Sequence, residues 1–222
     1  MKKAVFLMIS LFLIGCVHQN ISDNKSFAEN CNTASSICKR NYSILAEEIE
    51  KFNAAGGAFI LVNLKNNEVL NSASISILEN FDYNQDYSYT PNNVMKLLKG
   101  DKSAPPQQFI KDYAAFIKSA TKEDLKKLRS NVTNGTARRI NIENVNVYGL
   151  TATDYKLDNP DEVITAFLGH FNYKEQDYAL ITLLDAPKGI KSTFGFNSSG
   201  WNATELGRKI VESVVLNANL AK

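Results

Sequence analysis

The sequence has few of the side chains from which proteins build metal centres. Its 222 residues include only two histidines, His18 and His170, and three cysteines, Cys16, Cys31 and Cys38. The histidines lie far apart, and neither has a second ligand at a metal-binding spacing such as His-x-x-x-His. We therefore expect no metal site, and no motif indicates another cofactor.

An excess of charge of one sign is also lacking. The 25 lysines and arginines nearly balance the 23 acidic residues, which leaves a net charge of +2 at pH 7. This balance gives no support for nucleic-acid binding or for a polybasic membrane surface. Hydrophobic residues make up 44% of the chain and charged residues 22%, which is typical of a globular protein. The length suits one domain with a substantial core.

The N-terminus has the layout of a bacterial export signal. Two lysines precede an apolar run, residues 4–14, that is too short to span a bilayer as a helix. The sequence Leu13-Ile14-Gly15-Cys16 resembles a lipobox, the signal for cleavage before a cysteine that then receives a lipid. The alternatives are an ordinary signal peptide and a buried helix that happens to contain a cysteine. We predict a lipoprotein signal peptide over residues 1–15 and lipidation of Cys16.

The segment that follows, residues 16–39, is polar and has no hydrophobic period. It predicts a flexible tether between the membrane and a domain over residues 40–222. A lipid on Cys16 would anchor the protein on the periplasmic face of the cell envelope. Val17 is not the inner-membrane retention residue of enteric lipoproteins, so resemblance to that rule favours the outer membrane. Cys31 and Cys38 either form a disulfide or remain free thiols, and the sequence leaves both open.

Hydrophobic periodicity predicts helices and strands throughout the domain. An amphipathic helix near residues 44–54 has a polar face composed of Glu47, Glu48, Glu50 and Lys51. A second helix has an apolar stripe that consists of Phe109, Tyr113, Phe116 and Ile117. Two more helices are predicted after Thr121, a good N-cap, and after residue 203. Strands are predicted at residues 58–64, 69–74, 145–155, 163–171 and 178–185.

Four segments form an ordered set of motifs. Residues 147–154 (VYGLTATD) are a strand with a glycine where another backbone or a ligand can approach closely. Residues 89–96 (YTPNNVMK) come before it, as do an opening strand pair at 56–70 and a helix end at 128–138 (LRSNVTNGTAR). Together these segments resemble the transpeptidase domain of the penicillin-binding proteins, and the likeness runs from about residue 40 to residue 216.

The resemblance implies an α+β fold. We expect an antiparallel sheet of about five strands with helices on both faces, as in transpeptidases and β-lactamases. The helical region is expected to be truncated, because the interval between residues 89–96 and the strand at 147–154 is short. The family's Ser-x-Asn element belongs in that interval, and the sequence contains no good match to it there.

The residues that the family uses for chemistry are replaced. The resemblance places the nucleophilic serine at Asn93, whose amide cannot form an acyl-enzyme. It places the lysine of the Lys-Thr-Gly strand at Leu150, which cannot bind a substrate carboxylate. No catalytic residue is therefore expected to be intact. The positions that align with the family's site are Asn93, Lys96, Leu150, Thr151, Ala152 and Thr153.

We expect a non-catalytic transpeptidase-like lipoprotein with an accessory or binding role in peptidoglycan synthesis or cell division. Its partners would be a peptidoglycan stem peptide or cell-wall synthesis proteins, by resemblance alone. One alternative is a residual serine acyl-transferase or hydrolase that uses Ser119 and Lys122, provided that the pair lies close together and faces Thr151. A decaying duplicate without a selected role is another. His170 is expected to be an ordinary strand residue.

Overall fold

A five-stranded antiparallel sheet forms the centre of the domain. The computed structural model describes residues 36–76, 106–155, 159, 161–189 and 200–220. In these residues the sheet has the order β2-β1-β5-β4-β3, so β2 and β3 are its edge strands. The bounds are β1 (Gly56–Asn63), β2 (Glu68–Ile75), β3 (Asn146–Tyr155), β4 (Val163–Tyr173) and β5 (Gln176–Asp185).

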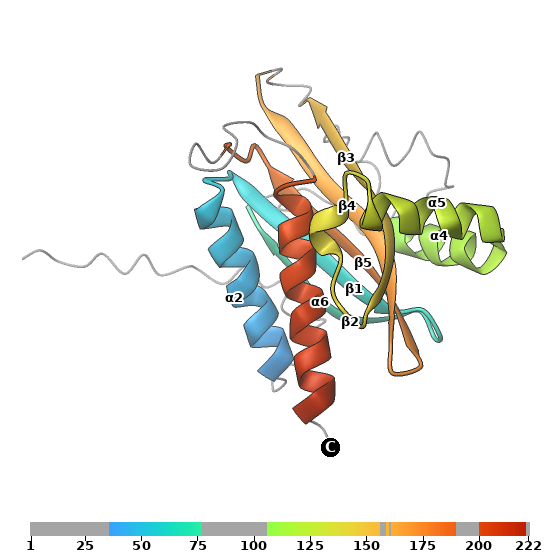
Figure 1. The fold of residues 1–222 in the computed structure, drawn as a ribbon. Coiled ribbons are helices and arrows are strands. Elements are labelled where there is room, and N and C mark those ends of the chain that lie inside the picture. Colours follow the sequence, from blue (N-terminus) through green and yellow to red (C-terminus); the bar gives the residue numbers. More distant parts are fainter. Residues whose placement is uncertain (1–35, 77–105, 156–158, 160, 190–199, 221–222) are drawn as a thin grey trace, which may run out of the picture.

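Helices cover both faces of the sheet. Helices α2 and α6 lie side by side across one face, and α4 packs on β1 and β5 from the other (Figure 1). Helix α5 packs against β3. This arrangement confirms the predicted α+β fold with helices on both faces. The bounds are α2 (Ser36–Lys51), α4 (Pro106–Ser119), α5 (Lys122–Thr133), the short 3-10 helix η1 (Arg138–Ile140) and α6 (Ala203–Leu220).

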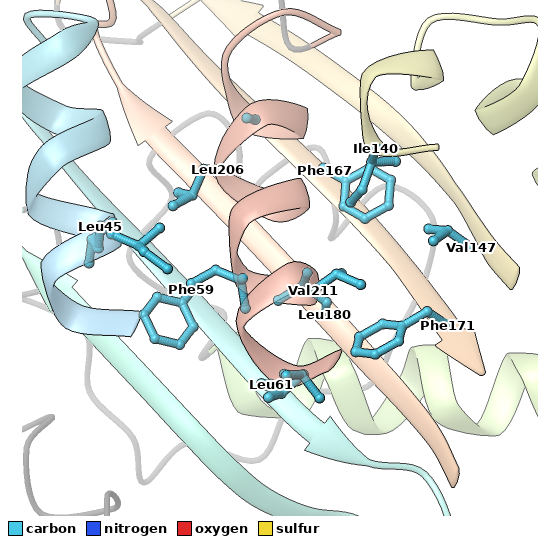
Figure 2. Packing of buried hydrophobic residues seen from close by; sticks show 14 of the residues in the cluster. Leu45, Phe59, Leu61, Ile140, Val147, Phe167, Phe171, Leu180, Leu206 and Val211 are labelled. Carbon is cyan, nitrogen blue, oxygen red and sulfur yellow. The ribbon is translucent and has the colours of Figure 1, made fainter. Parts of the chain in front are cut away.

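Strand alternation assigns side chains to the two faces. Phe59 and Leu61 of β1 join Phe167, Phe171 and Leu180 in the core beneath α2 and α6 (Figure 2). Their neighbours in the sequence point to the opposite face, because successive side chains of a strand alternate. There Ile60, Val62, Leu168 and Ile181 pack with Tyr113 of α4. Both faces of the central strands are therefore buried, which explains why their sequences are continuously apolar.

Helix α2 begins earlier than the sequence suggests. It starts at Ser36, so the last four residues of the predicted tether belong to the domain. The reason is a buried polar contact to the edge strand β2. The Asn41 side chain is fully buried and donates to Oδ1 of Asn71 at 2.7 Å, and Nδ2 of Asn71 lies 3.4 Å from Sγ of Cys38.

Glu48 was predicted to lie on the solvent-exposed polar face of α2, and this prediction is wrong. Its carboxylate is fully buried, because α6 packs beside α2 and covers it. Nζ of Lys51 lies 3.3 Å from Oε2 of Glu48, and Lys209 of α6 forms an ion pair with Oε1. Burial lowers the pKa of Lys209, but the hydrogen bond and charge of Glu48 outweigh burial and raise that pKa above its usual value. Glu48 therefore joins the two helices through charge.

A second carboxylate, Glu205 in the first turn of α6, extends this ionic cluster. Nη1 of Arg139 donates to Oε2 of Glu205 at 2.7 Å, and Nζ of Lys51 lies 3.4 Å from Oε1. Burial raises the pKa of Glu205, but the charges of Lys51 and Arg139 and the bond from Arg139 outweigh it and lower that pKa. The Arg139 guanidinium also stacks on the ring of Trp201, 3.1 Å from its centroid.

The apolar stripe predicted for α4 is only partly correct. Tyr113 is buried and Ile117 is half-buried against the sheet, but Phe116 is 38% exposed. Its ring centroid lies 6.1 Å from that of Tyr113, so it shields the edge of the contact and does not enter the core.

None of the helices in the described ranges combines the length and apolar character needed to cross a bilayer.

Candidate functional site

The positions that correspond to the Lys-Thr-Gly motif lie on β3, an edge strand. Leu150 is directly opposite Leu168 of β4, and Ala152 is opposite Ala166, so both point to the face that α4 covers in part. Thr151 points to the other face. Leu150 remains 37% exposed, although it is apolar. A lysine at this position would present its ammonium group to solvent at the sheet edge, and leucine presents only methyl groups.

Thr151 is held by a hydroxyl pair. Its Oγ1 lies 2.7 Å from Oγ1 of Thr136, in the turn that follows α5. Asn131 of α5 organises this turn: its Oδ1 accepts from the backbone N–H of Thr136 at 3.2 Å and from the Thr136 hydroxyl at 3.0 Å. Because the Thr136 hydroxyl donates to Asn131, the Thr151 hydroxyl donates to Thr136, so the pair can only accept hydrogen bonds from a ligand. A hydroxyl pair is also not a nucleophile without a neighbouring base.

Two side chains of α5 attach this helix to the outer edge of β3. Nδ2 of Asn131 donates to the carbonyl of Gly149 at 2.9 Å, and Nη1 of Arg129 donates to the carbonyl of Val147 at 2.9 Å. Helix α5 begins as the sequence predicts, with Thr121 and Asp124 in a reciprocal capping box. Burial of Leu128 and Val132 then fixes which face of α5 meets the sheet. The sequence-based interpretation missed the role of Asn131.

The glycine in β3 makes room for an aromatic ring and for the backbone of β4. Gly149 lies directly opposite Gly169 of β4. A Cβ atom on Gly149 would lie 2.6 Å from Cε2 and Cζ of Phe167 and 2.7 Å from the carbonyl oxygen of Leu168, and one on Gly169 would clash with the carbonyl oxygen of Tyr148 and with the Phe167 ring. The close approach that the sequence indicated is therefore that of the neighbouring backbone of β4, together with the fully buried Phe167 side chain.

His170 lies on β4, directly opposite Tyr148 and on the same face of the sheet as Leu150. Its ring stacks on Tyr148 of β3, with centroids 4.6 Å apart and planes within 2°. The Tyr113 hydroxyl of α4 lies 3.0 Å from Nδ1. Burial lowers the pKa of His170 from 6.5 to about 4, although the charge of Asp177 opposes the shift. The ring is thus neutral at pH 7 and joins α4 to the sheet as a packed residue.

Solved structures with this arrangement share one fold. The transpeptidase domain of FtsI4 D,D-transpeptidase from Legionella pneumophila superposes with a TM-score of 0.61 at 14% identity, covering 81% of this chain and 96% of that one. The transpeptidase domain of penicillin-binding protein 3 from Burkholderia pseudomallei gives a TM-score of 0.57 at 12% identity, covering 83% and 95%. The chain has the fold of a penicillin-binding-protein transpeptidase domain.

Sequence comparison identifies a relative that is itself a probable transpeptidase. The probable peptidoglycan D,D-transpeptidase FtsI of Caulobacter vibrioides is 29% identical over 105 residues, which cover 41% of this chain. The match spans only 18% of that relative's own length. No family model matches the chain. The similarity therefore concerns part of a much longer protein.

Ser119, the alternative nucleophile, is hydrogen-bonded within its own helix. The Ser119 hydroxyl donates to the carbonyls of Phe116 at 3.1 Å and Ala115 at 3.3 Å in its own helix. No hydrogen bond joins it to Lys122, which is also described. Thr151 lies on β3, whereas α4 packs on β1 and β5. The structure therefore shows no hydrogen bond between Ser119 and Lys122 in the described residues, and a Ser119–Lys122 nucleophile stays an alternative hypothesis.

Several predicted positions fall outside the described residues. These include Asn93, Lys96, Cys16 and Cys31, so the nucleophile and lipidation assignments remain predictions. Cys38 is disulfide-bonded, but its pairing with Cys31 stays a prediction because Cys31 is not described. Among the residues that are described, no group of three or more His, Cys, Asp or Glu side chains is placed to hold a metal ion.

Acidification is expected to destabilise the domain through His170. The unfolded chain binds a proton near pH 6.5 and the folded chain only near pH 4. Stability is therefore complete above pH 6.5 and is lost as the pH falls toward 4. Between pH 7.5 and pH 5 the free energy of unfolding should decrease by about 2 kcal/mol. Urea unfolding at both pH values measures the loss.

The matched control for this pH dependence is His170→Gln, which keeps a polar side chain that does not titrate. It should lower stability at both pH values and abolish most of the difference between them. An unchanged difference in the His170→Gln variant would assign the pH dependence to other groups.

Proposed function

We propose that this chain is a non-catalytic, lipid-anchored transpeptidase-like protein of the bacterial cell envelope. Its role would be to bind a peptidoglycan stem peptide or a cell-wall synthesis protein during peptidoglycan synthesis or cell division. The fold supports the class of protein, and the names of the FtsI relative and of the similar solved domains support the cell-wall process. The lipid anchor rests on the lipobox-like sequence that ends in Cys16.

The non-catalytic part of the proposal depends on the presence of leucine at position 150. It stands where the resemblance requires a lysine, on the edge strand β3 with its side chain partly exposed. Removal of that cation leaves a substrate or penicillin carboxylate without its charge-assisted hydrogen bond. The hydroxyl oxygens of Thr136 and Thr151 can still accept hydrogen bonds from a ligand. Such a site can bind without reacting.

Fluorescent penicillin tests this proposal directly. The full chain is incubated with the probe and separated on a denaturing gel, next to an active serine transpeptidase at the same concentration. We expect a labelled band from the active enzyme and less than one hundredth of that signal from this chain, because Asn93 offers no hydroxyl to acylate.

The Ser119→Ala variant provides the decisive comparison. A covalent label on the wild-type chain that disappears in Ser119→Ala would show a relocated nucleophile and would overturn the non-catalytic assignment. A label that persists in Ser119→Ala would also overturn it and would direct the search to another hydroxyl. The Lys122→Gln variant tests whether any such nucleophile depends on its proposed lysine partner.

A further inference from the structure

One segment of the chain is strongly basic, although the net charge of the whole chain is small. Residues 122–139, which comprise α5, the turn after it and η1, contain six basic and two acidic side chains. This gives the segment a net charge of +4, whereas the whole chain has a net charge of only +2. The rest of the chain is therefore slightly acidic, and the positive charge is concentrated beside the edge strand β3.

Three of these basic side chains share one face of α5. Lys122, Lys126 and Arg129 are spaced four and three residues apart, which places them along one stripe of a helix. We call these three residues the basic stripe. Leu128 and Val132, on another side of the helix, are buried against the domain. Lys122 and Lys126 are exposed and Arg129 is half-buried, so the stripe is open to solvent.

The acidic residues of α5 do not neutralise the basic stripe. Glu123 pairs with Lys127 at 2.9 Å. Asp124 accepts from the backbone N–H and the hydroxyl of Thr121 in the capping box, at 3.0 and 2.7 Å. Within the described residues neither Lys122 nor Lys126 has an ion-pair partner. Unpaired charges of one sign on one helix face are a typical binding surface for a partner of opposite charge.

We propose that the basic stripe docks the domain on the surface of a bilayer that contains anionic lipid headgroups. Exposed lysines suit a flat, hydrated anionic surface, where each basic side chain adds to the attraction. The inference rests on the membrane anchor of the proposed function. About 20 residues separate Cys16 from the start of α2, and a chain of that length spans about 25 Å as a random coil or about 70 Å when fully extended.

Docking through α5 would also set the position of the candidate site. Arg129 belongs to the basic stripe and at the same time donates to the carbonyl of Val147 on β3. Asn131 attaches the same helix to Gly149. Helix α5 and the edge strand therefore form one unit, and a membrane contact through the basic stripe would hold Thr151 and Leu150 close to the bilayer surface.

Energy transfer from Trp201, the single tryptophan of the chain, can measure this contact. Trp201 stacks on Arg139 of η1, at the end of the basic segment. The full chain is attached to phosphatidylcholine vesicles with a dansyl-labelled headgroup, with or without 30% phosphatidylglycerol. We expect greater transfer on the anionic vesicles at low salt, and loss of the difference in 0.5 M NaCl.

The variant Lys122→Gln/Lys126→Gln tests the basic stripe and leaves the bond from Arg129 to β3 intact. Its ratio of docked to undocked protein on anionic vesicles should be about thirtyfold lower than that of the wild type. The matched control, Lys39→Gln/Lys65→Gln, removes the same charge from exposed positions on α2 and in the β1–β2 turn. The control variant should dock like the wild type.

Each outcome separates the inference from the proposed function. Equal transfer on neutral and anionic vesicles, or an equal loss in the control variant, overturns docking through α5. If soluble polyphosphate binds in a Lys122- and Lys126-dependent manner while anionic vesicles leave the transfer unchanged, the partner is an anionic polymer and the membrane inference is wrong. Failure of the chain to attach to neutral vesicles argues against the lipid anchor, whereas docking on anionic vesicles would still support the basic stripe.

Discussion

Replacement of Phe167 by alanine is expected to lower the free energy of unfolding by about 4 kcal/mol. The ring is fully buried between the sheet and α6, and it fills the space that Gly149 and Gly169 leave open on β3 and β4. Because two adjacent positions have no side chain, few neighbouring atoms can move into the cavity. Urea unfolding of the variant, followed by far-UV circular dichroism, measures the loss.

Gly149→Ala provides a double-mutant test of this packing. In the wild type a Cβ on Gly149 meets the Phe167 ring at 2.6 Å, and we expect the substitution to cost about 1–3 kcal/mol. In the Phe167→Ala background the ring contact is gone and the contact with the Leu168 carbonyl, at 2.7 Å, remains, so the added methyl group should cost less. If the two substitutions are simply additive, the Phe167 ring does not contribute to the cost of a side chain at position 149.

Replacement of Glu48 by glutamine is expected to cost about 3 kcal/mol. The substitution leaves Lys209 and Lys51 beside a buried amide that cannot balance their charge. The two lysines are partly exposed and can regain water, which places the expected loss at the lower end of the range for a broken buried ion pair. Urea unfolding at pH 7 and low salt measures the change.

Glu47→Gln is the matched control for Glu48. Glu47 precedes Glu48 on the same helix and lies 4.0 Å from Lys209, but its side chain is 66% exposed. The loss in this variant should be within about 0.5 kcal/mol. Similar losses for the two variants would show that burial of Glu48 has no special energetic role and that α2 and α6 are held together by apolar contacts alone.

Most of the fold could be predicted because its signals are local. The apolar runs of β1, β4 and β5 predict central strands, and Thr121 predicts the start of α5 through its own capping bond. Burial of Glu48 could not be predicted in this way. Helical spacing placed Glu48 on a polar face, and only the packing of α6 beside α2 brings Lys209 to it.

In the candidate site, too, local sequence signals could be predicted and contacts between distant segments could not. The replacement of lysine by Leu150 and the survival of Thr151 can be read from the sequence, because the motif occupies consecutive positions. The contacts of Asn131 with Thr136 and with Gly149 depend on a turn and on a helix–strand approach that no short pattern encodes. The glycine in β3 was also ambiguous, since a ligand and the ring of Phe167 leave the same signature in sequence.

The bonds from Arg129 and Asn131 to β3 have a consequence for self-association. An edge strand with free carbonyls is a template on which a second copy of the same chain can add its own strand, the first step toward aggregates. Here the carbonyls of Val147 and Gly149 are already occupied by side chains from α5. A second copy therefore cannot pair with the first half of β3. The strand needs neither a proline nor a bulge to prevent edge-to-edge pairing, and it can remain regular.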